Sequence, residues 1–193
     1  MKNKFILASG SPRRRELLSQ VGIKFSVKVS DADEDIEETN PRELVKKLSF
    51  IKADDVYYKM DSNQEDEDLV VIGADTIVVS GGKIMGKPKN RSGARKMINR
   101  LQGRSHYVYT GVTVMTCDKA ITFVERTKVK VYKMNKKQID EYLNTREYVD
   151  KAGAYGIQGA FAAYVKTIKG DYNNVVGLPV GRLCYELRKE GII

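Results

Sequence analysis

The residues with the clearest chemical potential lie near the N-terminus, in the segment Ser-Gly-Ser-Pro-Arg-Arg-Arg (9–15). The apolar run 5–8 predicts a short buried strand before it, and Ser11 followed by Pro12 is typical of a helix start. The free N–H groups and positive dipole end of a helix attract anions. Arginines there oppose the dipole, and they donate bidentate hydrogen bonds to phosphate. The segment predicts a phosphate site; the alternative is a set of exposed surface arginines.

A second candidate is Asp75, which precedes Thr76 inside the apolar, β-branched run 69–79. That run predicts a buried central strand. An unpaired buried carboxylate is costly, so Asp75 lies at an exposed strand end or has a partner. Such carboxylates are candidate general bases or metal ligands. A carboxylate that caps a neighbouring loop is the alternative, and this residue alone does not decide.

The segment Gly81 to Pro88 nearly fits the phosphate loop G-x-x-x-x-G-K-[ST], but Pro88 stands where the magnesium-binding hydroxyl is needed. The segment also lies in a turn between strands rather than between a strand and a helix. These two departures exclude a kinase or P-loop ATPase. Lys87 keeps the ability to contact a phosphate.

Carboxylates for a metal are available in the acidic segment 31–38, which contains Glu34. A triphosphate is normally handled as its magnesium complex, so some carboxylates must hold metal. Most acids of this segment are expected to be solvated. Lys52 follows Leu48 by four positions, beside the apolar stripe of a predicted helix, so it points either into a cleft or out to solvent.

Composition excludes several other classes of protein. The 193 residues, 41% apolar and 31% charged, are those of a globular chain. With His106 as the single histidine, which we interpret as structural, acid–base work falls to carboxylates or lysines. Cys117 and Cys184 lack metal-ligand spacing and cannot make a disulfide framework, so we expect two reduced thiols among apolar neighbours.

The net charge of +9 raises the question of nucleic acid, but the basic residues are scattered along the chain. The sequence also lacks the aromatic pair of an RNA-recognition sheet, so no stable nucleic-acid partner is expected. No run approaches the ~18 to 20 apolar residues of a membrane helix. The N-terminal apolar stretch is too short for a signal peptide, so we expect a cytoplasmic protein without a membrane partner.

The periodicity of apolar residues and the placing of helix start and stop residues predict an α/β fold, in which helices and strands interleave around a mixed sheet. Residues 61–68 are expected to form a surface loop, and the chain is expected to be one domain over 1–193 with room for two lobes. Helices are expected after Ser11, after Asn40, over 92–101, after Asn135 and after Pro179. Strands are expected at 5–8, 25–29, 69–79, 105–116, 120–133, 161–168 and 175–176.

Six segments, in order along nearly the whole chain, resemble the Maf (septum-formation inhibitor) family of nucleoside triphosphate pyrophosphatases. They are 7–18, 71–78, 85–88, 100–106, 150–159 and 175–179. The resemblance implies an elongated mixed β-sheet flanked by helices with a central cleft, as in Maf and ITPase-like proteins. It also implies a divalent cation, Mg²⁺ or Mn²⁺, and a homodimer. The segment 61–68 is longer than is usual in the family.

The resemblance implies a role for each matching residue. Asp75 would accept the proton of the attacking water, and Glu34 and Asp75 would lie near the metal. The triphosphate would be held by Ser9, Arg14, Lys52 and Lys87. Arg13, Thr76 and Gln158 resemble the dTTP/UTP-hydrolysing branch. The chemistry agrees in part, because a glutamine amide matches the O4 and N3 edge of uracil or thymine.

The implied activity is hydrolysis of dTTP and UTP to the monophosphate and pyrophosphate, with nucleotide-pool house-cleaning as its role. Two alternatives stay open. One is a non-catalytic nucleotide- or nucleic-acid-binding regulator of cell division, and the other is a pyrophosphatase for modified purine nucleotides.

Overall fold

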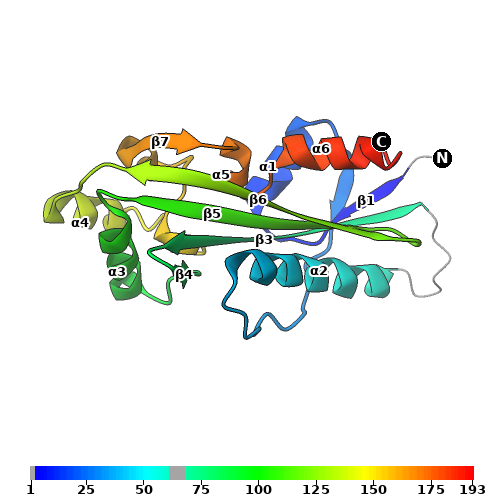
Figure 1. The fold of residues 1–193 in the computed structure, drawn as a ribbon, viewed down its shortest axis with the longest axis horizontal. Helices are drawn as coiled ribbons and strands as arrows, with labels where there is room; N and C mark the ends of the chain where they lie inside the picture. The colour runs from blue at the N-terminus through cyan, green and yellow to red at the C-terminus, as the bar shows by residue number, and fades with distance from the viewer. Residues whose placement is uncertain (1–2, 61–67) are drawn as a thin grey trace. The chain divides into compact units, whose positions relative to one another are not determined.

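The structure is a computed structural model that describes residues 3–60 and 68–193. The predicted surface loop 61–68 therefore lies almost wholly outside the described residues. The helices are α1 Pro12–Gln20, α2 Pro41–Met60, α3 Arg91–Leu101, α4 Lys136–Asn144, α5 Tyr172–Val176 and α6 Val180–Lys189, with 3₁₀ turns η1 Ala152–Ala154 and η2 Ala160–Tyr164 (Figure 1). The strands are β1 Lys4–Leu7, β2 Phe25–Val27, β3 Leu69–Ser80, β4 Lys83–Met85, β5 Ser105–Met115, β6 Ala120–Val131 and β7 Val165–Lys169.

The strands form one seven-stranded sheet in the order β2-β1-β3-β5-β6-β7, with β4 paired to β3. Strand β1 is parallel to β2 and to β3, which requires crossover connections, and these contain the helices α1 and α2. The β3–β4 and β6–β7 pairs are antiparallel. The predicted α/β fold, a mixed sheet flanked by helices, is confirmed.

The chain divides into two compact units, and the strands β3, β5 and β6 contribute residues to both. The first unit consists of Met1–Asp75, Thr110–Glu125 and Gly177–Ile193, and the second of Thr76–Tyr109 and Arg126–Val176. The expectation of one domain over the whole length stays a prediction.

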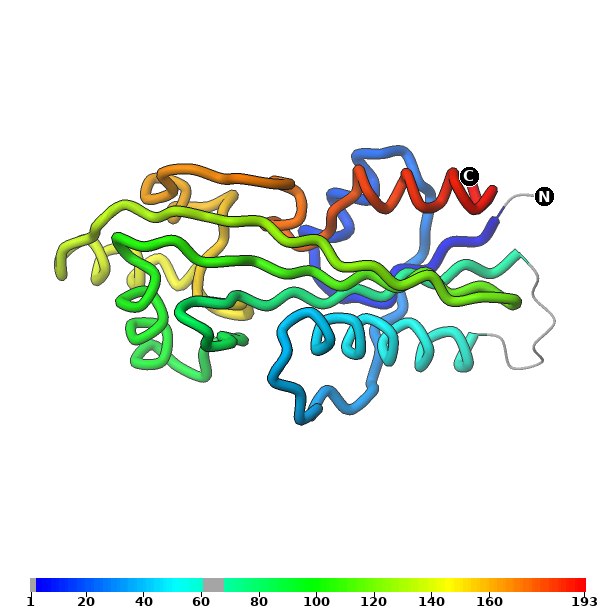
Figure 2. Tube along the Cα trace, viewed as in Figure 1, coloured from blue at the N-terminus to red at the C-terminus, as the bar shows by residue number. Residues whose placement is uncertain are grey.

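In the first unit, helix α2 packs closely on the sheet because glycines lie beneath it. A Cβ on Gly73 of β3 would lie 2.7 Å from the backbone nitrogen of Ala53, and one on Gly111 of β5 would lie 2.5 Å from the carbonyl carbon of Val45. Neither distance leaves room for a side chain. Figure 2 shows the consequence, with α2 running alongside β3.

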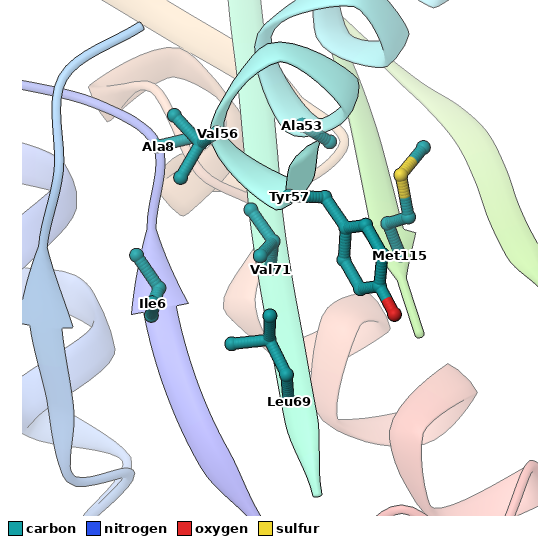
Figure 3. Close-up of a cluster of buried hydrophobic side chains, with 8 residues drawn as sticks. All are labelled: Ile6, Ala8, Ala53, Val56, Tyr57, Leu69, Val71 and Met115. Atoms are coloured by element: carbon teal, nitrogen blue, oxygen red, sulfur yellow. The ribbon is translucent and has the colours of Figure 1, made fainter. Parts of the chain in front are cut away.

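The core of this unit forms between α2 and the strands (Figure 3). Its members are all buried and come from β1 and the residue after it, β3, β5 and α2: Ile6, Ala8, Ala53, Val56, Tyr57, Leu69, Val71 and Met115. Leu7 and Ile72 point to the opposite face of the same strands, and they have no exposed surface. Strands β1 and β3 are therefore buried on both faces in this unit, as the continuous apolar run 69–79 predicted for β3.

The second unit has an aromatic core. The Phe161 ring lies 4.6 Å from that of Tyr155 and 5.0 Å from that of Tyr142, centroid to centroid. His106 is 1% exposed, and its Nε2 lies 2.7 Å from the Tyr155 hydroxyl. Burial lowers the pKa of His106 to about 4, so the imidazole is neutral near pH 7. The structural interpretation of this histidine agrees with its place in the core.

Three local predictions were wrong. The segment 161–168 begins as the 3₁₀ turn η2, whose three-residue period turns Phe161 and Tyr164 toward each other, with ring centroids 5.8 Å apart.

Residues 175–176 end helix α5, which Asn174 anchors by donating hydrogen bonds to Val108 O and Thr127 Oγ1. Cys117 is exposed rather than packed among apolar neighbours, because it lies in the short turn between β5 and β6.

Candidate functional site

The β1–α1 junction holds Arg14 over Ser9 in the first unit. The Arg14 guanidinium donates from Nη1 to Ser9 Oγ at 3.0 Å and from Nε to the Gly177 carbonyl at 2.8 Å. Burial lowers the pKa of Arg14, and Arg13 lowers it further, whereas Asp75 and Glu34 act in the opposite direction. A guanidinium stays protonated even so. The site therefore holds a desolvated cation that an anion would stabilise.

The start of α1 adds backbone donors to this cation. Pro12 occupies the first turn, and within the described helix no acidic residue follows there. The N-cap residue of α1, Ser11, makes no capping hydrogen bond through its side chain. The first N–H groups of α1 therefore have neither a capping side chain nor a helix carboxylate, which is the arrangement that binds phosphate at a helix N-terminus.

Lys52 of α2 links two carboxylates, also within the first unit. Its Nζ lies 2.6 Å from Asp75 Oδ1 and 2.9 Å from Glu34 Oε2. The side chains of Lys52 and Asp75 are 12% and 14% exposed, whereas that of Glu34 is 55% exposed. Asp75, in the middle of β3, is therefore partnered, and Lys52 points toward this strand rather than out to solvent. The structure thus brings together three residues that the sequence analysis had singled out separately.

Gly73 explains why Lys52 reaches Asp75. It precedes Asp75 by two positions on β3, so both lie on the face of the strand that α2 covers. Because Gly73 has no side chain, the backbone of α2 at Ser49 and Ala53 lies against it, three positions before Lys52 and one position after it. Sequence reasoning singled out Asp75 in this run and missed the packing role of Gly73.

Arg13, beside Arg14 in the first unit, is half-buried, and three further predicted residues belong to the second unit. Thr76 follows Asp75 on β3 and is half-buried, and Lys87 and Gln158 are exposed. The turn before Lys87 is held by a hydrogen bond from Gly153 N to Gly86 O at 3.1 Å. Gly153 has a φ of +68° and lies against the Val78 side chain, so a larger residue would be strained there.

Glu147 supports the turn that carries Gln158. Its Oε2 accepts a hydrogen bond from Ala160 N at 2.8 Å, and a Cβ on Gly159 would lie 2.7 Å from its carboxyl carbon. Gln158 is exposed, while Ile157 before it is 6% exposed. The turn is therefore fixed on both sides of an outward-pointing amide. The sequence analysis missed Glu147, and a lone glutamate in a loop offers no local signal for this contact.

The carboxylates fit one kind of metal site. Among residues 3–60 and 68–193, no three His, Cys, Asp or Glu side chains are grouped to hold a metal ion. Glu34 and Asp75 form a pair through Lys52. Mg²⁺ is commonly bound by one or two carboxylates together with water and substrate phosphates. A pair of carboxylates suits a metal that arrives with a nucleotide better than a resident metal.

In the part of the chain that the structure describes, no helix has the length and apolar character needed to cross a membrane.

Comparison with known proteins shows similarity along nearly the whole chain. The dTTP/UTP pyrophosphatase of Agathobacter rectalis is 46% identical over 202 residues, covering 98% of each chain. That of Lachnoclostridium phytofermentans is 46% identical and covers 97% of this chain and 95% of the relative. That of Bacillus anthracis is 44% identical and covers 98% of this chain and 96% of the relative. The Maf-like protein family matches residues 4–190. The chain belongs to the Maf-like protein family.

Proposed function

We propose that this protein is a nucleoside triphosphate pyrophosphatase that hydrolyses dTTP and UTP to the monophosphate and pyrophosphate. The observation that carries the proposal is the Lys52 ammonium between Asp75 and Glu34, in the same unit as the Arg14–Ser9 pair. This combination supplies a candidate base, a cation in contact with it and an anion site. The relatives named dTTP/UTP pyrophosphatase, 44–46% identical, support the same activity.

In the proposed reaction, Asp75 accepts a proton from water while the water oxygen forms a bond to the α-phosphorus. The bond from that phosphorus to the bridging oxygen breaks, and pyrophosphate leaves with its electron pair. Lys52, Arg14 and Lys87 stabilise the charge of the phosphates. Ser9 holds the Arg14 guanidinium in place. In this reaction the protein accelerates hydrolysis mainly by positioning the substrate and stabilising its charge.

We also propose that Glu34 and Asp75 hold Mg²⁺ or Mn²⁺ in the loaded enzyme. Such an ion would neutralise phosphate charge. Lys52 then has a second role, since its single positive charge offsets part of the charge of the two carboxylates before the ion and the nucleotide arrive.

Base selection is assigned to Gln158, Arg13 and Thr76. A glutamine amide both donates and accepts, so it matches O4 and N3 of uracil or thymine. Arg13 only donates, which favours a carbonyl over the amine of cytosine. Leaving one such contact unpaired costs about 1 to 3 kcal/mol, or roughly 5- to 150-fold in kcat/KM.

The test is a nucleotide panel with Mg²⁺, scored for pyrophosphate release. We expect dTTP and UTP to be hydrolysed better than CTP, ATP and 7-methyl-GTP. Gln158→Glu is expected to erode the preference for uracil and thymine, because a carboxylate cannot donate to O4. If 7-methyl-GTP were the best substrate, the base selection would be wrong. If no nucleotide released pyrophosphate, a non-catalytic regulator would be favoured instead.

A further inference from the structure

One face of the second unit's sheet carries positive charge in a regular pattern. Along β6, Arg126, Lys128 and Lys130 are exposed and alternate with buried residues. Successive side chains of a strand point to opposite faces, so these three cations share the solvent face. Two positions along an extended strand are about 6 to 7 Å apart. The result is a row of evenly spaced cations.

Strand β7 adds a cation directly beside this row. Lys169 lies opposite Lys128 in the antiparallel β6–β7 register, and like charges in that relation are destabilising. Among residues 3–60 and 68–193, none of these four cations makes an ion pair. Lysines on an edge strand also discourage aggregation, but β6 lies between β5 and β7 (Figure 1). Edge protection therefore does not account for the row on β6.

Strand β5 adds aromatic rings to the same face. Tyr107 and Tyr109 are half-buried, while His106 and Val108 are buried. The two tyrosine ring centroids lie 6.3 Å apart, and the Arg126 guanidinium carbon lies 4.9 Å from the Tyr107 ring centroid. This contact places the tyrosines on the side of the sheet that carries the cations.

We propose that this surface binds single-stranded nucleic acid without sequence preference. We call it the basic face; its residues are Tyr107, Tyr109, Arg126, Lys128, Lys130 and Lys169. Single strands expose phosphates and base faces together, and proteins bind them with basic tracks and aromatic stacking. A duplex or an anionic membrane would use the cations but would leave the tyrosines without a role. The sequence expectation of no nucleic-acid partner rested on scattered cations and no aromatic pair, and the fold brings both together.

The proposal is independent of the proposed hydrolysis. None of the six residues is among those assigned to the nucleotide, the metal or the attacking water. Loss of one activity can therefore be observed without loss of the other.

The test is fluorescence anisotropy of the full-length protein with a 3′-labelled oligothymidylate that ends in a 5′-hydroxyl. A length of about 16 nucleotides matches the upper end of the sites that a single OB fold occupies on single strands. Four phosphate contacts predict a slope of about −3 for log K against log salt. Lys128→Glu with Lys130→Glu is expected to weaken binding about tenfold or more and to flatten that slope. Tyr107→Ala is expected to weaken binding about fivefold or more at an unchanged slope, because stacking is lost.

The matched control is Lys96→Glu with Lys136→Glu, which changes the net charge equally at exposed positions on α3 and α4. Folding is checked by the melting temperature, which is expected not to fall, because Lys128→Glu replaces the like-charge pair with Lys169 by a pair of opposite charges. Pyrophosphate release from dTTP is expected to be unchanged in all these variants. The proposal is overturned if the control weakens binding equally, if Tyr107→Ala has no effect, or if a dTTP analogue with a non-hydrolysable α–β linkage displaces the probe.

Discussion

The Lys52 ammonium donates to Asp75 Oδ1 at 2.6 Å, so the candidate general base is held by a cation from the facing helix. The same ammonium contacts Glu34 at 2.9 Å. A triphosphate would offer Lys52 further charged acceptors. In the proposed mechanism, movement of the ammonium toward phosphate would leave Asp75 able to accept a proton and would couple substrate binding to activation of the base.

Asp75→Asn is expected to lower kcat for dTTP by about 10² to 10⁴, because the amide has the same shape but cannot accept the proton. The measurement is pyrophosphate release, with circular dichroism as the check on folding. Asp35→Asn, an exposed acid of the 31–38 segment, is the control and is expected to keep full activity. More than about a tenth of wild-type kcat in the Asp75 variant would contradict the base assignment.

Lys87→Ala is expected to lower kcat/KM for dTTP by about tenfold, because one charge-assisted contact to phosphate is removed. The loss is expected to be greater at low ionic strength than at high ionic strength, since salt screens an exposed charge. Lys89→Ala, exposed two positions along, is the matched control. Equal kinetics for both variants at low salt would remove Lys87 from the phosphate site.

Gly73→Ala is expected to reduce stability by about 1 to 3 kcal/mol, because the added Cβ would meet the backbone of α2. It is also expected to lower kcat/KM, because the added Cβ would push α2 off the strand and move Lys52 away from Asp75. Urea unfolding and dTTP kinetics measure the two effects. Gly181→Ala is the control: nothing lies within 4 Å of a Cβ there, and alanine favours the helix α6. A Gly73 variant as stable as wild type would refute the close packing.

Glu147→Ala is expected to reduce discrimination between dTTP and CTP by about fivefold, because the turn bearing Gln158 loses the acceptor for Ala160 N. We expect the ratio of the two kcat/KM values to fall while the melting temperature changes little. Glu141→Ala, exposed on α4, serves as the comparison. If kcat/KM fell equally for dTTP and CTP, Glu147 would support the fold rather than base selection.

Stability is expected to fall as the pH drops from about 6.5 toward 4, because of His106. Burial lowers the pKa of His106 to about 4 in the folded protein, so over this range only the unfolded chain gains the proton. Acidification therefore favours unfolding, by at most about 1.4 kcal/mol per pH unit. Urea midpoints measured from pH 7 to pH 4.5 test this. His106→Gln does not titrate and is expected to show a smaller pH dependence; identical slopes would exclude His106 as the cause.

Elements governed by neighbours in sequence were predictable from the sequence. Asn135 caps α4 as expected, with Gln138 N donating to Asn135 Oδ1 at 2.9 Å and Gln138 Oε1 accepting from Asn135 N. The apolar run around Asp75 forms the buried strand β3, and the paired glycines at 81 and 82 turn it into β4. Caps, turns and periodicity act over four residues or fewer, so the residue types alone carry the information.

Contacts between distant segments were decided only by the tertiary structure. Lys52 and Asp75 are 23 positions apart, and they meet because Gly73 admits α2. The segment after Asp171 forms α5 rather than a strand because Asn174 reaches Val108 and Thr127. Lys128 and Lys169 look scattered in sequence but lie opposite each other in the sheet. Residue types determined which chemistry was available, whereas packing and strand register, which depend on contacts across the whole chain, decided which side chains meet.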